Sequence, residues 1–268
     1  MNNRLTDAFA RLHESESKAL MPFITAGYPD RDKFMQVANV ICQNGADVLE
    51  IGFPHSDPLA DGPVIQHASH TAISGGFTVE SGFEQIKSLT TNCLTPVVVM
   101  CYTNLLLRME VRKFIRHCAI SGVSGLIVPD MIIEESVEVS ELCRSNNIAF
   151  INLVTPTTLP ERAMRISEAT TGFIYLVSVT GTTGARARIT TNIKAMTARL
   201  RRCSNLPVCV GFGVSSPEMA GEMAKHCDGV IIGSKILSLI DGDNGNQQYT
   251  QLRNFLSETR MKLGASHG

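Results

Sequence analysis

The stretch Asp47-Val-Leu-Glu-Ile-Gly-Phe53 is apolar at nearly every position, and Glu50 is the one ionisable residue in its middle. A strand with one face in water alternates between apolar and polar residues, whereas a strand covered on both faces is apolar almost throughout. The stretch therefore predicts a buried strand of a parallel sheet whose faces are covered by helices.

Seven further short runs have the same character and recur along the chain. Each is separated from the next by a longer segment, several of which have the spacing of an amphipathic helix. Together with residues 47–53, these runs predict eight strands that alternate with helices. The seven runs are Leu20–Thr25, Pro96–Tyr102, Gly125–Pro129, Ile148–Val154, Phe173–Ser178, Pro207–Gly211 and Gly229–Gly233.

Four segments between the runs carry apolar residues three and four positions apart, which predicts helices with one buried face. They are Asp32–Asn44, Glu110–Ser121, Ile189–Cys203 and Pro217–Lys225. Gly45 and Gly122 directly follow two of them, as C-terminal glycine caps do, and Pro217 after two serines is typical of a helix start. One more helix is predicted before the first strand, where four apolar residues share a face: Leu5, Ala8, Phe9 and Leu12.

This alternation predicts an α/β fold, a single (βα)8 TIM barrel with an extra N-terminal helix that occupies residues 1–268 as one domain. The chain length suits one such barrel. A doubly wound open sheet is the alternative, but the first run is not followed by the G-x-G-x-x-G fingerprint with which such a sheet binds a dinucleotide. In a barrel, catalytic groups lie at the carboxyl ends of the strands, which limits the search for a site to eight short regions.

The composition excludes several classes of protein. The net charge of −1 gives no basic surface for nucleic acid. The chain has no run of 18 apolar residues that would predict a membrane span, and residues 1–7 lack the apolar core of a signal peptide. The eight cysteines form no CxxC pair and lie mostly among apolar neighbours, as thiols in a reducing compartment do. We expect a cytoplasmic protein that binds neither nucleic acid nor a membrane.

Glu50 is the first candidate for chemistry, because it lies inside an apolar strand. Burial without a partner is costly for a carboxylate and raises its pKa, and a general acid that works near neutral pH needs such a raised pKa. The alternative is a core glutamate paired with a buried lysine or arginine. Because none of the eight runs contains either residue, the sequence favours the functional interpretation.

The loop Pro54-His-Ser-Asp-Pro-Leu-Ala-Asp-Gly-Pro63 follows the same strand at the end where a barrel carries its catalytic groups. Asp57 precedes a proline, and such an aspartate is a common turn residue. Asp61 is better placed as a second, mobile carboxylate, because Gly62 beside it allows movement. Two carboxylates in different surroundings can divide the roles of acid and base.

Three glycine-rich segments follow the sixth, seventh and eighth runs. Ser178–Arg186 is interpreted as a lid or as a donor of backbone N–H groups to phosphate, with a plain surface loop as the alternative. Gly211–Pro217 and Gly229–Lys235 place glycine where a strand ends and a helix begins. Glycine lets a ligand approach the backbone, and helix N-termini attract anions. Since barrels often bind phosphate after strands seven and eight, the sequence predicts a phosphate site there.

Three other candidates carry less weight. His67 and His70 lie three positions apart near His55, but no nearby residue completes a usual ligand set, so no metal is predicted. Lys235 is expected to begin a helix and to face outward rather than to form a Schiff base. The run Met100-Cys-Tyr102 is interpreted as a pocket wall rather than as a nucleophile, and no G-x-S-x-G elbow is present.

The motif Leu49-Glu-Ile-Gly-Phe-Pro54, followed by Ser56-Asp-Pro-Leu-Ala-Asp-Gly-Pro-Val-Ile-Gln66, resembles the signature of the tryptophan synthase α subunit family. This long motif is highly specific, and the resemblance extends over nearly the whole chain. Its other matching segments are Pro22–Pro29, Tyr102–Asn104, Pro129-Asp130, Glu134-Glu135, Tyr175–Gly184, Gly211–Gly213 and Gly233-Ser234.

The resemblance implies a lyase of tryptophan biosynthesis that cleaves indole-3-glycerol phosphate to indole and glyceraldehyde 3-phosphate by a retro-aldol step. Glu50 would be the acid–base group at indole carbon 3, Asp61 would stabilise or take the indole N–H proton, and Thr183 would hold Asp61 when the lid closes. Phosphate would be bound by the backbone N–H groups of Gly184, Gly213, Gly233 and Ser234. The apolar candidates for the indole pocket are Phe23, Met100, Tyr175, Phe212 and Ile232.

The resemblance also implies a partner. Members of the family work in an α2β2 heterotetramer with a β subunit, which uses pyridoxal phosphate and receives the indole through a tunnel. Asp57 and its loop resemble part of that contact surface, and this chain itself would carry no cofactor and no metal. The residues that depart from the family pattern are His55, where an aromatic or apolar residue is expected, Thr182 in place of valine, and Pro129 and Met131 beside Asp130.

Two other functions remain as alternatives. Another phosphosugar barrel enzyme would place its acid–base residues elsewhere than on the second strand and its loop. A barrel that only activates a β subunit would keep the fold and the interface without turnover, and the intact Glu50, Asp61 and Thr183 argue against it. A lyase that releases indole without a partner is a variant of the main prediction.

Overall fold

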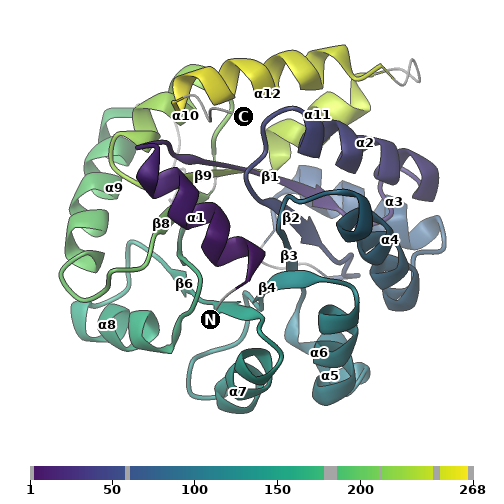
Figure 1. The fold of residues 1–268 in the computed structure, drawn as a ribbon, viewed down its shortest axis with the longest axis horizontal. Coiled ribbons are helices and arrows are strands. Elements are labelled where there is room, and N and C mark those ends of the chain that lie inside the picture. Colours follow the sequence, from purple (N-terminus) through teal and green to yellow (C-terminus); the bar gives the residue numbers. More distant parts are fainter. Residues whose placement is uncertain (1–2, 58–60, 178–185, 212, 244–247, 265–268) are drawn as a thin grey trace.

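The computed structural model describes residues 3–57, 61–177, 186–211, 213–243 and 248–264, with the backbone alone for residues 186–192. Its strands are β1 (Ala19–Thr25), β2 (Leu49–Gly52), β3 (Val97–Met100), β4 (Val123–Ile127), β5 (Ala149–Ile151), β6 (Leu153–Val154), β7 (Ile174–Val177), β8 (Val208–Gly211) and β9 (Gly229–Ile232). They form one sheet in the order β5-β4-β3-β2-β1-β9-β8-β7-β6. All its pairings are parallel, and Figure 1 shows helices around it on every side.

The sheet closes on itself at Asn152. β5 pairs with β4 and β6 pairs with β7, and this single residue separates β5 from β6. The Asn152 side chain donates to Thr170 Oγ1 at 3.1 Å, and its carbonyl accepts the Tyr175 amide at 3.2 Å. The fifth predicted run therefore forms two short strands that belong to the two edges of the sheet. The predicted TIM barrel is confirmed, and the alternative of an open sheet is wrong.

The helices lie between consecutive strands and cover the outside of the barrel (Figure 1). The four predicted from spacing are α2 (Arg31–Gln43), α6 (Val111–Ile120), α9 (Arg186–Leu200) and α10 (Pro217–Ala224). The predicted glycine caps are confirmed, because Gly45 and Gly122 have φ values of +91° and +73° and directly follow the C-cap residues of α2 and α6. The other helices on the barrel wall are α3 (Pro63–Ser74), α4 (Val79–Asn92), α5 (Thr103–Arg108), α7 (Val137–Ser145), α8 (Pro160–Ala169), α11 (Ser234–Asp241) and α12 (Thr250–Lys262).

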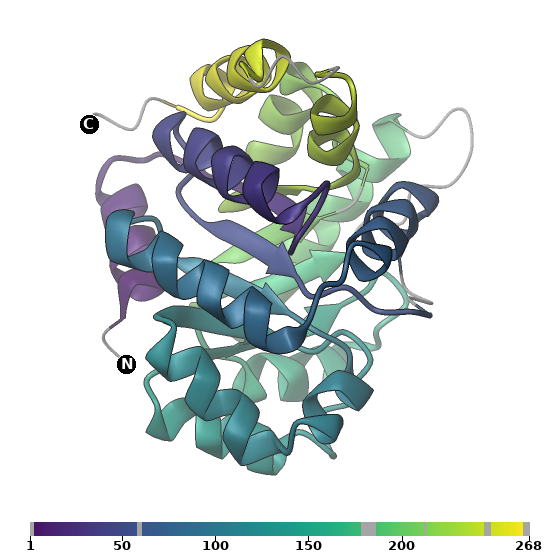
Figure 2. The same ribbon diagram turned by 90° about the vertical axis from the view of Figure 1, so that its right-hand side faces the viewer.

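The helix α1 (Arg4–Glu14) covers the amino-terminal end of the barrel, as the purple ribbon shows in Figure 1 and at the left of Figure 2. Asn3 caps its first turn by accepting the amides of Leu5 and Thr6. The Phe9 ring lies 5.7 Å from the ring of Phe173, which precedes β7. The predicted N-terminal helix is thus confirmed, with all four of its predicted apolar residues buried: Leu5, Ala8, Phe9 and Leu12. A ligand must approach from the opposite, carboxyl end.

Two apolar layers stabilise the barrel. An inner cluster fills it with strand side chains such as Met21, Val98, Cys209 and Ile231, and an outer cluster packs the strands against the helices. Because the strands contribute side chains to both layers, their sequences are apolar almost throughout. Among the residues that the structure describes, no helix has the length and apolar composition to cross a membrane.

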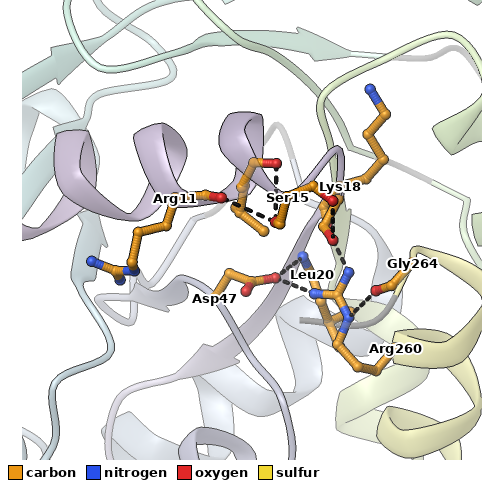
Figure 3. Close-up of polar contacts among 9 residues, drawn as sticks. Arg11, Ser15, Lys18, Leu20, Asp47, Arg260 and Gly264 are labelled. Atoms are coloured by element: carbon orange, nitrogen blue, oxygen red, sulfur yellow. Dashed lines mark hydrogen bonds and ion pairs between the residues drawn. The ribbon is translucent and has the colours of Figure 1, made fainter. Parts of the chain in front are cut away.

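The last helix is bound to the amino-terminal end of the barrel by Arg260, drawn in Figure 3. Its guanidinium forms an ion pair with Asp47 and donates to the carbonyls of Lys18 at 2.6 Å and Gly264 at 3.0 Å. Asp47 also accepts the Leu20 amide at 2.7 Å. One cation therefore joins α12 to the starts of the first two strands.

Candidate active site

Glu50 lies in β2, in register with Phe23 of β1 and Val98 of β3. Its side chain is fully buried, and neither carboxylate oxygen has a hydrogen-bond partner among the described residues. The alternative of a glutamate paired with a buried lysine or arginine is therefore wrong for this part of the chain. Burial, with a further contribution from the negative charge of Asp61, raises the pKa of Glu50 to about 8. At neutral pH this group holds a proton that it can donate.

Asp61 lies at the carboxyl end of the barrel, just before α3, and it has polar neighbours that Glu50 lacks. The Tyr102 hydroxyl donates to Asp61 Oδ2 at 3.1 Å, and the side-chain amide of Gln66 donates to the Asp61 carbonyl at 2.9 Å. Burial raises the pKa of Asp61, while the Tyr102 hydrogen bond and the charge of His55 act in the opposite direction. The two carboxyl groups thus have different surroundings, which allows one to act as an acid and the other as a base.

A small pocket lies at the carboxyl ends of β1, β2 and β3, and Glu50 is not among the residues that line it. It brings together three of the predicted site residues, Phe23, Asp61 and Met100. The Phe23 ring lies so close to Gly52 that a Cβ atom there would approach it to 2.5 Å, so this glycine makes room for an aromatic wall. The other residues that line the pocket are Thr25, Phe53, Ile65, Ser69 and Tyr102.

Tyr175 and Ile232 are the other described candidates for the indole pocket. Ile232 ends β9 in register with Pro22 of the neighbouring β1, whereas Tyr175 lies in β7, three strands from β1 in the sheet. Tyr175 is buried in the inner cluster, and burial together with the charges of Glu50 and Asp61 raises its pKa well above the ordinary value. Its neighbourhood therefore includes both carboxylates. Ile232 is fully buried in the outer cluster, which also contains Phe23. Their contact with a ligand stays a prediction.

The predicted phosphate site is described in part. Gly213 follows β8 with a φ of +78°, a conformation that favours glycine. Gly233 precedes α11, whose first residue is Ser234, so backbone N–H groups of that helix point toward the carboxyl end of the barrel. Thr183, Gly184 and Phe212, and with them the predicted lid and Thr182, lie outside the described residues.

Thr25 and Tyr102 are two of the pocket residues that were not predicted as site residues. Thr25 ends β1, and its fully buried hydroxyl has no hydrogen-bond partner among the described residues. The sequence could have indicated Thr25, because it is a polar residue at the carboxyl end of an apolar strand. Tyr102 follows β3 at the same end of the barrel. The run Met100–Tyr102 was interpreted only as a pocket wall, and the contact of Tyr102 with Asp61 forms only in the folded barrel.

The weaker candidates lie away from the pocket. His67 and His70 are exposed on α3, and the described residues contain no group of three or more possible metal ligands. Lys235 lies in the first turn of α11 with its Nζ 6.0 Å from the ring centroid of Phe255 in α12, so it faces outward as predicted. Asp57 is exposed, and its amide donates to His55 Nδ1 at 3.0 Å.

Known proteins resemble this chain along nearly its whole length. The profile of the family described as "Tryptophan synthase alpha chain" matches residues 9–265. The tryptophan synthase alpha chain of Gloeobacter violaceus is 41% identical, over 96% of this chain and 94% of the relative. That of Prochlorococcus marinus is 39% identical, over 96% and 93%.

Solved structures agree with the sequence relatives. The tryptophan synthase subunit alpha of Legionella pneumophila aligns with a TM-score of 0.90 at 30% identity, over 98% of this chain and 99% of that chain. A structure of tryptophan synthase from M. tuberculosis aligns with a TM-score of 0.89 at 30% identity, again over 98% and 99%. From the profile match, the relatives and the shared fold, this protein belongs to the tryptophan synthase alpha chain family.

Proposed function

We propose that this lyase of tryptophan biosynthesis uses Glu50 and Asp61 to cleave indole-3-glycerol phosphate into indole and glyceraldehyde 3-phosphate. The observation that carries the proposal is Glu50, a buried carboxyl without a described partner whose pKa is raised to about 8. Such a group costs stability, and protonated acids of this kind are typical of catalytic sites. Family membership makes the barrel lyase the favoured function over a barrel that only activates a partner.

Glu50 acts first as the acid. The bond between indole carbon 3 and the first glycerol carbon breaks only when carbon 3 becomes part of a leaving group, and protonation of this carbon by the Glu50 carboxyl achieves that. The positive charge that this creates spreads to the indole nitrogen. The Asp61 carboxylate stabilises it there by accepting the N–H, and this charge interaction is strong in a site shielded from water.

Glu50 then acts as the base. After giving its proton to carbon 3 it is a carboxylate, and it takes the proton of the hydroxyl on the first glycerol carbon. The electrons of that O–H bond form the aldehyde carbonyl of glyceraldehyde 3-phosphate, and those of the broken carbon–carbon bond return to the indole ring. No water, metal or cofactor enters this balance, so we propose that the chain carries none.

The binding groups orient the substrate between the two carboxyl groups. Phe23 and Met100 are apolar walls beside Asp61, and together with Tyr175, Phe212 and Ile232 they are proposed to form the slot for the indole ring. The N–H groups of Gly184, Gly213, Gly233 and Ser234 are proposed to hold the phosphate. Binding energy from a remote phosphate can fix the reacting carbon atoms in place. Thr183 would hold Asp61 in the closed state.

The partner is proposed to be a tryptophan synthase β subunit in an α2β2 assembly, which would hold the pyridoxal phosphate. A groove on the outer surface beside the loop after β2 supports a docking site at this end of the barrel. Exposed Asp57 adjoins that groove, and Leu107 is an exposed apolar residue on the neighbouring helix α5. The residues that line the groove include Pro54, His55, Ser56, Asn104, Leu105, Arg108 and Met109.

The compartment and the domain organisation are proposed on the same basis. All eight cysteines are free thiols, which supports a reducing cytoplasm. Residues 1–268 are proposed to form one domain, because α1 near the amino terminus and α12 near the carboxyl terminus both contact the same barrel (Figure 1).

The test is indole release from indole-3-glycerol phosphate by the purified chain, alone and with a β subunit, for wild type and Glu50→Gln. We expect slow release that rises when the partner is added and that disappears in the variant. Fast release without a partner would indicate an independent lyase. No release by the wild type under either condition would overturn the catalytic proposal.

A further inference from the structure

His55 connects the surface loop after β2 to Asp61 in the pocket. Its imidazole packs against the Tyr102 ring, with centroids 4.7 Å apart and planes at 34°. The Tyr102 hydroxyl donates to Asp61 Oδ2 at 3.1 Å. On its other side, His55 Nδ1 accepts the amide of Asp57 at 3.0 Å. A continuous chain of contacts therefore runs from exposed Asp57, through two rings, to the candidate catalytic carboxylate.

Each of these contacts restricts the next residue on the way to Asp61. The hydrogen bond from Asp57 fixes the imidazole, because the accepting Nδ1 must face the loop amide. The fixed imidazole covers one face of the Tyr102 ring and restricts its rotation, and the position of that ring determines where the hydroxyl lies. A hydroxyl held in place keeps the Asp61 carboxylate oriented and favours its ionised form.

We propose that His55 is a positioning residue for Asp61, whose imidazole holds Tyr102 so that the tyrosine hydroxyl stays on the carboxylate. The proposal rests on the lyase function proposed above. It also gives a role to a position where this chain departs from the pattern of its family. An aromatic hydrocarbon ring there could supply the packing but neither the acceptor for the Asp57 amide nor a charge.

A charge on His55 has a second effect, which is an alternative to the Asp57 hydrogen bond because a protonated Nδ1 cannot accept an amide. A positive imidazole favours the carboxylate form and lowers the pKa of Asp61. This effect requires a charge on the ring, whereas the packing effect does not. The other titratable and charged side chains that line the two surface pockets beside His55 are Asp57, His70, Glu80, Arg108, Glu110 and Lys113.

Two substitutions separate packing from hydrogen bonding. His55→Phe keeps a ring against Tyr102 but has no acceptor. His55→Asn has no ring, but its side-chain oxygen can accept the amide two residues later, as in an Asx turn. We expect His55→Asn to lower kcat about tenfold with KM within about twofold of wild type. We expect His55→Phe to keep kcat within about twofold. The fall of kcat toward acidic pH should move to higher pH, because without the charge of His55 the pKa of Asp61 is higher.

The route through Tyr102 is tested by combining variants, since two residues that act in one chain do not give independent effects. If His55 acts through Tyr102, the double variant His55→Asn, Tyr102→Phe has the same kcat as Tyr102→Phe alone. Multiplicative losses would overturn the proposal, as would an unchanged kcat in His55→Asn or equal losses in His55→Asn and His55→Phe. His70→Asn is the matched control, because His70 is exposed on the same pocket, and we expect no change in kcat.

A titration of the Asp61 carboxyl carbon by NMR separates this proposal from the lyase function. The measurement needs no turnover, so it stands even if the wild-type chain releases no indole. His55→Asn should raise the pKa of Asp61, and the same substitution in a Tyr102→Phe background should have a smaller effect, leaving only the loss of charge. An Asp61 pKa that is equal in wild type and His55→Asn would show that His55 does not act on this carboxylate.

Discussion

Arg260 of α12 and Asp47, which precedes β2, form an ion pair although they are 213 residues apart in the sequence. Their side chains retain 11% and 13% of their exposed surface, and the aliphatic part of Arg260 packs against Gly45. Figure 3 shows the guanidinium between the strand starts and the last helix. The pair lies at the end of the barrel opposite the candidate active site, so its effect should be on stability.

Substitution of Arg260 should therefore destabilise the fold with little effect on catalysis. Arg260→Ala leaves Asp47 nearly buried without its cation, and we expect the free energy of unfolding to fall by about 3–5 kcal/mol. Protonation of Asp47 removes the unpaired charge, so the deficit should shrink toward acidic pH. Urea unfolding of wild type and variant at neutral pH and near about pH 4.5 checks both points. A deficit independent of pH would show that packing, not charge, dominates.

Glu50 should reduce the stability of the fold as the pH rises. Its pKa in the folded state is about 8, compared with an ordinary value of 4.5, so the folded state binds this proton more tightly than the unfolded state. Stability from this group is present below about pH 4.5 and is lost as the pH rises to about 8. At about 1.4 kcal/mol per pKa unit, the loss is on the order of 3–5 kcal/mol.

The matched variant for this prediction is Glu50→Gln, which cannot ionise. Its free energy of unfolding should approach that of wild type at acidic pH and exceed it increasingly up to about pH 8. Urea unfolding of both proteins across this range gives the difference directly. A constant difference between the two proteins would contradict a raised pKa at Glu50.

The activity should depend on the same proton. If Glu50 is the acid that protonates indole carbon 3, turnover requires its neutral form, so kcat should fall as the pH rises through about 8. Steady-state indole release from pH 6 to 10, with the β subunit present, measures this basic limb. In Glu50→Gln we expect a loss of about a hundredfold or more at all pH values and no such limb. A flat profile through pH 9 in wild type would assign the acid to another group.

The sequence allowed the barrel to be predicted because its strands are buried on both faces, which is visible in each short run. The same pattern exposed Glu50, since an ionisable residue in an apolar run is conspicuous without any structure. It did not reveal the division of the fifth run at Asn152. That division depends on which neighbouring strands the two halves pair with, and local hydrophobicity is similar on both sides.

The contacts around Asp61 could not be predicted from the sequence. Asp61 itself could be selected from its loop, but its partner Tyr102 is 41 residues away and lies in another apolar run. Thr25 is a single polar residue at a strand end, and only the folded barrel shows that its hydroxyl lacks a described partner. The family resemblance supplied Thr183, Gly184 and Phe212, which lie outside the described residues, so their roles remain predictions.

Gly52 should be required for the shape of the indole slot. A Cβ atom at this position would lie 2.5 Å from Phe23 Cζ, so Gly52→Ala must displace the ring into the pocket. We expect KM for indole-3-glycerol phosphate to rise about tenfold, with a loss of about 1–3 kcal/mol in the free energy of unfolding from overpacking. Gly242→Ala is the control, because its Cβ would meet no atom closer than 3.5 Å, and both quantities should stay near wild type. An unchanged KM in Gly52→Ala would mean that Phe23 does not form the wall of the slot.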